Sequence, residues 1–242
     1  MNRFTGLSII IPTVDETRCI SETMEIISGI CEKDDIAEIL IIHSRNSSID
    51  HIRSLFSLAE KYSEWNVMVL SQPGSGLGDA LFYGCCTCKG SHFLMIGADR
   101  ENDTFALKKM LSLAKQHPDT VITTSRALEK DGLREYSFLK RLLCGMFRIC
   151  ARFFFGSRQT DITYAYQITP KAVFDPEFFA PDHRAFVLEL ALMADIKKLP
   201  LLEIPTKINK RNEGVSHSGI RYYFGFAMTA ARMWMMKVWR CV

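Results

Sequence analysis

The sequence predicts an α/β fold, with one mostly parallel β-sheet flanked by helices, and three observations favour it. Along residues 7–124, short continuous apolar runs typical of buried strands alternate with segments whose apolar residues recur at helical spacing. The connections between these segments are short, as in repeated strand–helix–strand units. The chain has 242 residues, 48% of them apolar and 24% charged, which is enough for one large domain with a full core.

The strands are predicted from the apolar runs. The first run is Leu7–Ile11, which Pro12 stops, and we interpret it as a buried strand. Similar runs predict the later strands at Ala37–Ile42, Val67–Leu70, His92–Ile96, Val121–Thr124 and Leu201–Ile204.

The helices are predicted from the spacing of apolar residues. In Arg18–Ile30, the residues Ile20, Met24 and Ile27 share one helical face. The same reasoning predicts helices at Ile49–Tyr62, at Asp79–Cys88 after a glycine turn over Gly74–Gly78, at Thr104–His117 with Asp103 or Thr104 as its N-cap, and at Phe186–Ala194.

Two regions mix aromatic and basic residues. Tyr136–Phe155 predicts one or two basic amphipathic helices, and Ile220–Val242 has a similar composition. The net charge is +5 over residues 126–158 and +6 over residues 207–242, although it is only +3 for the whole chain. Bulk charge therefore gives no reason to expect a nucleic-acid partner, whereas the two regions indicate a local anionic partner such as phosphate or a lipid headgroup.

The two basic regions suit helices that lie in a membrane interface, with rings among the headgroups and cations toward anionic lipid. The alternative is a core or dimer-contact helix whose cations reach solvent, which leaves a homodimer possible. No stretch reaches the ~18 uninterrupted apolar residues of a spanning helix, and Leu7–Ile11 is too short for a signal peptide.

The eight cysteines fit a reduced, cytosolic setting. Cys85 and Cys88 form a CxxC, but no second pair or nearby histidine accompanies them. We therefore interpret them as small buried residues on a helix rather than as a zinc site.

Four polar loops follow predicted strands. In parallel sheets, ligands bind at the carboxyl ends of the strands, so we expect these loops to form one rim. They are Pro12–Glu16, His43–Ser48, Gln72–Gly78 and Gly97–Asp103.

The last of these loops carries three alternate acids, Asp99, Glu101 and Asp103. Alternate side chains of an extended segment point to the same side, so the carboxylates could converge. Mg²⁺ and Mn²⁺ prefer such oxygen ligands and often share them with phosphates, which indicates a nucleotide-activated substrate. The alternative is a solvated turn whose acids cap the next helix.

The order of these signals resembles family 2 glycosyltransferases, which have the GT-A fold. The resemblance covers about residues 5–217, which we take as one GT-A-like domain followed by a basic amphipathic helical segment over 218–242. It rests on Ser8–Glu16, Gly74–Ala80, Gly97–Asp103, Asp161–Thr163, Glu189, Glu203–Pro205, Arg211 and Gly214–Ser216. The branch that this order resembles is the polyprenyl-phosphate sugar synthases, similar to dolichol-phosphate mannose synthase.

The resemblance implies site residues for each part of the reaction. The donor nucleotide would contact Pro12, Asp15, Glu16, Gly76, Gly78 and Asp99, and the metal, Mg²⁺ or Mn²⁺, would be held by Asp99 and Glu101. The catalytic residues would be Asp161 and Arg211, and the acceptor phosphate would contact Arg126, Arg141, Arg211 and Ser216. For Asp15 and Glu16, acids favoured at a helix N-terminus are the alternative. For Asp161, it is a structural cap, and for the arginines it is surface solvation. Lys140 could align in place of Arg141.

Four positions depart from the family pattern. Gly97 replaces the first acid of the metal motif, so Asp99 would carry the metal with help from Glu101. His43–Asn46 replaces the usual Asp-Asp-Gly-Ser, and we expect His43 to be a solvated loop residue. Gln167 and His217 stand where an arginine and a lysine are usual.

The function implied is that of an inverting glycosyltransferase. It would move a sugar from a nucleotide-diphosphate donor to an acceptor, expected to be a polyprenyl phosphate at the cytoplasmic membrane face. Two alternatives stay open: transfer to a soluble sugar or peptide acceptor, and a non-catalytic module that binds nucleotide or membrane.

Overall fold

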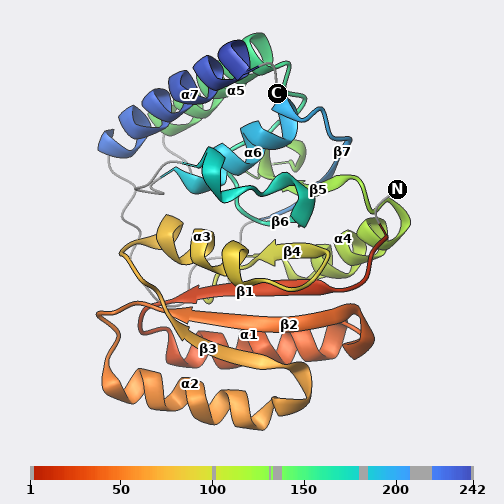
Figure 1. The fold of residues 1–242 in the computed structure, drawn as a ribbon, viewed down its shortest axis with the longest axis vertical. Coiled ribbons are helices and arrows are strands. Elements are labelled where there is room, and N and C mark those ends of the chain that lie inside the picture. The colour runs from red at the N-terminus through yellow and green to blue at the C-terminus, as the bar shows by residue number, and fades with distance from the viewer. Residues whose placement is uncertain are drawn as a thin grey trace.

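The computed structural model describes residues 3–99, 102–130, 132, 138–179, 185–207 and 220–240. Within these residues, seven strands form one sheet in the order β3-β2-β1-β4-β6-β5-β7 (Figure 1). The strands are β1 (Leu7–Thr13), β2 (Ile36–His43), β3 (Val67–Ser71), β4 (His92–Met95), β5 (Val121–Ser125), β6 (Gln167–Pro170) and β7 (Leu201–Pro205).

The helices cover both faces of the sheet and confirm the predicted fold class. They are α1 (Thr17–Ile30), α2 (Ile49–Lys61), α3 (Leu77–Thr87), α4 (Thr104–Gln116), α5 (Phe138–Phe155), α6 (Phe186–Ile196) and α7 (Ile220–Arg240). Short 3₁₀ turns lie at Lys33–Asp35, Ser63–Trp65, Arg126–Leu128, Lys171–Val173 and Pro176–Phe178.

The core has two halves because side chains alternate along each strand. Ile9 and Ile11 of β1 pack in one buried cluster with α1, α2 and α4, whereas Ile10 packs in the other with α3 and α6. A sheet buried on both faces explains why its strands appear as continuous apolar runs.

The predicted first strand is confirmed, and β1 continues past Pro12 to Thr13. Pro12 lies opposite Ile42 of β2, while the pairing of β1 with β4 ends at Ile10 opposite Met95. Backbone groups of a strand alternate in direction, so the Pro12 nitrogen points to the side where β4 has already ended. No ladder bond is lost there, and the strand tolerates the proline.

The strand β6 was not predicted. It lies between β4 and β5 and pairs antiparallel with both, which makes the sheet mixed. Its four residues are all buried, but Gln167 and Thr169 are polar and Pro170 ends the strand. The segment therefore lacks the continuous apolar run that marked the other strands.

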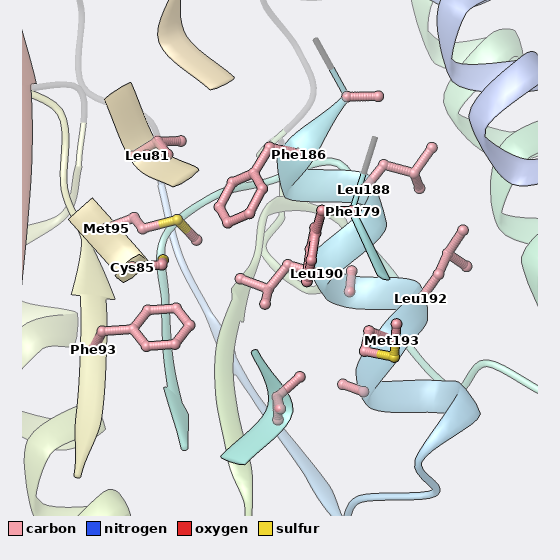
Figure 2. Packing of buried hydrophobic residues seen from close by; sticks show 14 of the residues in the cluster. Leu81, Cys85, Phe93, Met95, Phe179, Phe186, Leu188, Leu190, Leu192 and Met193 are labelled. Atoms are coloured by element: carbon pink, nitrogen blue, oxygen red, sulfur yellow. The ribbon is translucent and has the colours of Figure 1, made fainter. Parts of the chain in front are cut away.

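Apart from Glu189 and Asp195, the helix α6 is apolar on every side, as suits an enclosed helix. Phe186 and Leu190 point toward Phe93 of β4, as Figure 2 shows. Leu188 and Leu192 lie on the side of α6 that is turned toward α5 and α7. A helix that is hydrophobic all round is a buried helix, so α5 and α7 form an outer layer over it.

The C-terminal helix α7 belongs to the same core as the rest of the domain. Phe226 and Met233 are buried in the cluster that contains α6. Arg232 Nη2 donates to Glu189 Oε1 of α6 at 2.5 Å, and Glu189 is fully buried. The basic segment predicted from residue 218 onward is thus joined to the domain by packing and by an ion pair over its described part, 220–240.

Cys85 lies buried in α3, and Cys88 is buried directly after that helix. Among the residues that the structure describes, no group of three or more His, Cys, Asp or Glu side chains is arranged to hold a metal ion. The burial of both cysteines agrees with their interpretation as small buried residues, although Cys88 follows the helix rather than lying on it.

Candidate active site

The first two loops of the predicted rim are tied together. Asp15 Oδ1 accepts hydrogen bonds from the backbone N–H and the hydroxyl of Ser48, each at 2.9 Å. The backbone hydrogen bond from Ser48 lowers the pKa of Asp15. Ser48 in turn caps α2 by accepting from the N–H of His51. Asp15 therefore fixes the β1 loop against the start of α2.

Glu16 closes its own loop. Its Oε2 accepts from the Thr13 hydroxyl at 2.8 Å and from the Val14 N–H at 2.7 Å. The two acids predicted to contact the nucleotide thus shape the loop after β1 by local hydrogen bonds. Their contact with a nucleotide stays a prediction.

Two histidines lie beneath this rim. His51 is buried between β1 and α1, where its Nε2 is 3.2 Å from the Thr13 hydroxyl and its Nδ1 is 3.0 Å from the Thr17 hydroxyl. His51 was not predicted from the sequence; its place three residues after a capping Ser was the available signal. His43 is the last residue of β2 and is buried, so its description as a solvated loop residue is wrong.

The glycine-rich turn leads into α3 without a side-chain cap. Gly74 N–H donates to Asp79 Oδ2 at 2.8 Å, which closes the turn. Gly76 has φ +86°, a conformation that glycine adopts easily, and it precedes α3 with no side-chain cap bond. Gly78 lies in the first helical turn. The first N–H groups of a helix attract anions, so this end of α3 suits a phosphate.

The acidic loop after β4 folds back on itself. Gly97 N–H donates to Asn102 Oδ1 at 2.9 Å. A Cβ at Gly97 would lie 2.7 Å from Asp99 Oδ1, which shows that the Asp99 carboxylate covers Gly97. Asp103 accepts from the Phe105 N–H at 3.0 Å and caps α4, as predicted for that helix. Glu101 lies outside the described residues.

A chain of contacts joins this loop to the second half of the sheet. Asn102 Nδ2 donates to the Tyr164 hydroxyl at 3.2 Å. The Arg126 guanidinium stacks 4.4 Å above the Tyr164 ring. Arg126 Nε and Nη2 donate to the two carboxylate oxygens of Asp161 at 2.5 and 2.7 Å. Asn102 and Tyr164 are site residues that the sequence analysis missed.

The side chains of Arg126 and Asp161 are both buried, and their opposite charges largely neutralise each other. Arg126 follows β5 directly, as predicted, but its guanidinium faces Asp161 and Tyr164. The structure gives Asp161 the position of an organiser, with both carboxylate oxygens engaged. The roles predicted for these two residues in catalysis and acceptor binding stay predictions.

The remaining predicted residues fall in two groups. Pro12 lies in β1 beside the first loop, and Arg141 lies exposed in the first turn of α5. Arg211 and Ser216 are outside the described residues.

Comparisons with known proteins agree with this fold. The family model of glycosyl transferase family 2 matches residues 8–184. Glucosyl-3-phosphoglycerate synthase from Mycobacterium tuberculosis in complex with UDP aligns with a TM-score of 0.66 at 13% identity, over 95% of this chain and 80% of that one. Its complex with Mn²⁺, UDP-glucose and phosphoglyceric acid aligns with a TM-score of 0.66 at 14% identity and the same coverage.

A further mycobacterial protein aligns with a TM-score of 0.67 at 13% identity, over 93% of this chain and 74% of that one. At these identities the structural likeness shows the fold, which is the GT-A arrangement. No curated protein sequence matches the chain.

Proposed function

Because the chain belongs to glycosyl transferase family 2, we propose that it moves a sugar from a nucleotide-diphosphate donor to a polyprenyl phosphate at the cytoplasmic face of a membrane. The observation that carries the transfer reaction is the family match over residues 8–184, which includes all four loops of the rim. The observation that carries the lipid acceptor is an exposed apolar surface on α5 and α7.

The donor would bind across the first half of the sheet. The loop after β1, held by Asp15, and the uncapped start of α3 at Gly76 and Gly78 face the carboxyl ends of the parallel strands. Nucleotides bind at such ends, with the diphosphate near backbone N–H groups. Asp99 would lie at the diphosphate.

A divalent cation fits the acidic loop. Mg²⁺ and Mn²⁺ commonly bind to one or two carboxylates together with substrate phosphates and water, so Asp99 with Glu101 is a suitable donor set. Solved structures of glucosyl-3-phosphoglycerate synthase hold Mn²⁺ or Mg²⁺ with UDP, which supports this assignment. When bound, the ion neutralises charge on the departing diphosphate.

The acceptor phosphate needs no base. A phosphate monoester is ionised near neutral pH, so its oxygen can attack the anomeric carbon as the bond to the nucleoside diphosphate breaks, with inversion. Asp161 would then act as a positioning residue. It holds Arg126, and Arg126 stacks on Tyr164. The Tyr164 hydroxyl accepts a hydrogen bond from Asn102 of the acidic loop.

The membrane-facing surface is an apolar stripe along the whole of α5. Phe138, Leu142, Met146, Ile149 and Phe153 recur every three or four residues and are all exposed, Phe138 by 76% and Phe153 by 81%. On α7, Met228, Met235, Val238 and Trp239 are exposed as well. The two helices pack side by side, with Phe154 and Trp234 in edge contact (Figure 1).

An exposed apolar stripe flanked by cations is typical of a helix lying in a membrane interface. Among the described residues, no helix is both long and apolar enough to cross a bilayer. A lipid acceptor would reach the enzyme at the bilayer surface, which this stripe would contact.

The transfer reaction is tested by the release of nucleoside diphosphate from a panel of nucleotide-sugars, with polyprenyl phosphate in vesicles and with or without Mn²⁺. We expect Mn²⁺-dependent release from at least one donor, and a loss of at least 100-fold in Asp99→Asn. Tight nucleotide binding without release from any donor would support the non-catalytic alternative.

The membrane contact is tested separately by vesicle co-sedimentation of Ile149→Ser/Phe153→Ser. Both side chains are exposed, so the fold should be kept while binding falls about tenfold or more. Leu128→Ser/Phe105→Ser, which removes two exposed apolar residues outside α5 and α7, is the matched control. Equal binding by both variants and the parent protein would contradict the proposal.

A further inference from the structure

A recess at the C-terminal end of α5 gathers three arginines. The cavity has a volume of about 760 Å³. Its lining comes from the last turns of α5 and from the segment that follows, and consists of Arg148, Ile149, Arg152, Gly156, Ser157, Arg158, Gln159 and Thr160.

The backbone turn after α5 brings the third arginine to the other two. Gly156 has φ +72°, its N–H donates to the Arg152 carbonyl at 3.1 Å, and the Ser157 N–H donates to the Ala151 carbonyl at 3.3 Å. This is the usual way for a helix to end on a left-handed glycine. The chain reverses there, so Arg158 lies beside the helix rather than beyond it.

The gathering of like charges is unfavourable without a counter-charge. Arg148 and Arg152 are four residues apart, a spacing at which like charges repel on a helix. Cations in the last helical turn suit the helix dipole, which accounts for Arg152 but not for Arg158. Among the residues that the structure describes, Arg148, Arg152 and Arg158 form no ion pair with a carboxylate.

Two carboxylates near the recess are held by polar residues of the same segment. Gln159 Nε2 donates to Asp195 Oδ2 at 3.3 Å, and the Thr160 N–H donates to Glu203 Oε1 at 2.8 Å. Gln159 is buried, whereas the three arginines are exposed. The acids therefore face the interior side of the segment, and the guanidinium groups face solvent.

The recess is distinct from the donor rim. Thr160 contacts β7, which lies at the edge of the sheet opposite β3, and β6 and β5 separate this edge from β4, the nearest strand that carries a donor loop. Ile149 lines the recess and, with Phe153, belongs to the apolar stripe of α5. The cationic recess thus borders the surface proposed to contact a membrane.

We infer that this recess binds the phosphate group of an anionic lipid headgroup. The apolar stripe of α5 would insert beneath the headgroups. Guanidinium groups form paired hydrogen bonds with phosphate oxygens, and three of them can engage one phosphate from several directions. The inference rests on the membrane contact of the proposed function and adds a headgroup site that lies apart from the donor loops.

The test compares Arg148→Gln/Arg152→Gln/Arg158→Gln with the matched variant Arg53→Gln/Lys108→Gln/Lys109→Gln, which lowers the net charge equally at exposed positions on α2 and α4. One arm measures co-sedimentation with vesicles of phosphatidylcholine containing phosphatidylglycerol, and with phosphatidylcholine alone. The other arm measures binding of inorganic pyrophosphate by calorimetry. Thermal unfolding checks that both variants fold.

We expect the arginine variant to lose at least tenfold in affinity for the anionic vesicles, against less than threefold for the matched variant. Binding to pure phosphatidylcholine, which depends on the apolar stripe, should be similar in both. Arginine-dependent binding of pyrophosphate without arginine-dependent vesicle binding would keep the phosphate site but assign it to a free phosphate ligand.

Equal losses in the two charge variants, or no loss in either arm, would overturn the inference. Neither arm involves a sugar donor, so failure here is distinguishable from failure of the proposed transfer reaction. If the Ile149→Ser/Phe153→Ser protein still binds anionic vesicles through its arginines, the headgroup site stands and the membrane-insertion part of the proposed function fails.

Discussion

At Gly97, a side chain would collide with the Asp99 carboxylate, because an added Cβ would lie 2.7 Å from Oδ1. Gly97 stands where the family has an acid, and its lack of a side chain leaves the space that the Asp99 carboxylate occupies. This contact makes Gly97 a probe of Asp99 that leaves the Asp99 side chain itself intact.

We expect Gly97→Ala to push the Asp99 carboxylate aside and to weaken Mn²⁺-dependent nucleotide binding by about tenfold, or about 1.4 kcal/mol. The atom displaced is the end of a flexible side chain, so stability should change by less than about 1 kcal/mol. Nucleotide titrations with and without Mn²⁺ measure the effect, with Gly29→Ala, which meets no atom within 4 Å, as the control. Unchanged Mn²⁺ dependence would argue against Asp99 as a metal ligand.

Asp161 stabilises Arg126, in addition to any role that Asp161 has in the reaction. We expect Asp161→Ala to cost about 3–5 kcal/mol of unfolding free energy, because it leaves a buried guanidinium without its partner. The double variant Arg126→Met/Asp161→Ala should recover a large part of that loss. Denaturant unfolding measures both, and additive losses would show that the two groups are not coupled.

Asp195 makes folding pH-dependent. Burial raises its pKa to about 6, above the usual value of 3.8, despite nearby Lys237 and hydrogen bonds from Ser157 and Gln159. The folded protein thus binds this proton more tightly than the unfolded chain, so stability falls as pH rises from about 4 to about 6. The burial that raises the pKa of Glu203 acts in the same direction.

We therefore expect Asp195→Asn to be more stable than the parent protein by about 2–3 kcal/mol at pH 7 to 8, with no gain below about pH 4. Denaturant unfolding across this pH range measures the difference. Asp50→Asn, at an exposed carboxyl, should give no such gain. A gain that persisted at pH 3.5 would rule out the raised pKa as its source.

The ion pair between α6 and α7 explains why the C-terminal helix is part of the domain. Glu189 was noted in the sequence as an acid in a family position, and Arg232 only as one of several cations in an aromatic region. Neither position reveals that the two side chains meet at 2.5 Å. A long-range ion pair leaves no local pattern, so it could not be predicted from one sequence.

We expect Arg232→Met to lower the unfolding free energy by about 3–5 kcal/mol, since Glu189 stays buried without this cation. Glu189→Gln/Arg232→Met should be more stable than the single variant. Arg53→Met, at an exposed pair, should change stability by at most about 0.5 kcal/mol. If Arg232→Met behaved like Arg53→Met, the ion pair would not contribute to the docking of α7.

The predicted strands and helices were confirmed where the apolar pattern was strong. The runs that became β1, β2, β3, β4 and β7 are predominantly apolar, and β5 begins with two adjacent apolar residues, Val121 and Ile122. The helices had apolar residues at helical spacing, a recognisable cap or, in α6, an almost continuously apolar sequence. The strand β6 failed this criterion because half of it is polar and its burial depends on neighbours distant in sequence.

At the scale of the molecule, the sheet order follows from the predicted alternation only in part. The order β3-β2-β1-β4 continues the parallel pattern, whereas β6 enters antiparallel between β4 and β5. This insertion brings the Tyr164 hydroxyl to Asn102 of the acidic loop, while Tyr164 also stacks against Arg126, the partner of Asp161. The sequence therefore predicted the loops of the rim, but not the contacts that join its two halves.

The exposed surface of α5 shows the same division. The composition of residues 136–155 predicted a basic amphipathic helix, and α5 confirms it. Its exposed apolar stripe and the turn that brings Arg158 back to the helix depend on how α5 packs over α6. Together they give α5 a surface that is apolar along the helix and cationic at its C-terminal end.

The central claim is transfer of a sugar to a lipid phosphate. It is tested most directly by offering labelled nucleotide-sugars with Mn²⁺ to the protein in the presence of both polyprenyl phosphate vesicles and phosphoglyceric acid, and then measuring label in the organic and aqueous phases. We predict that label from at least one donor enters the lipid phase, and that Asp99→Asn abolishes this. Label found only in a water-soluble product, or no product from any donor, would contradict the claim.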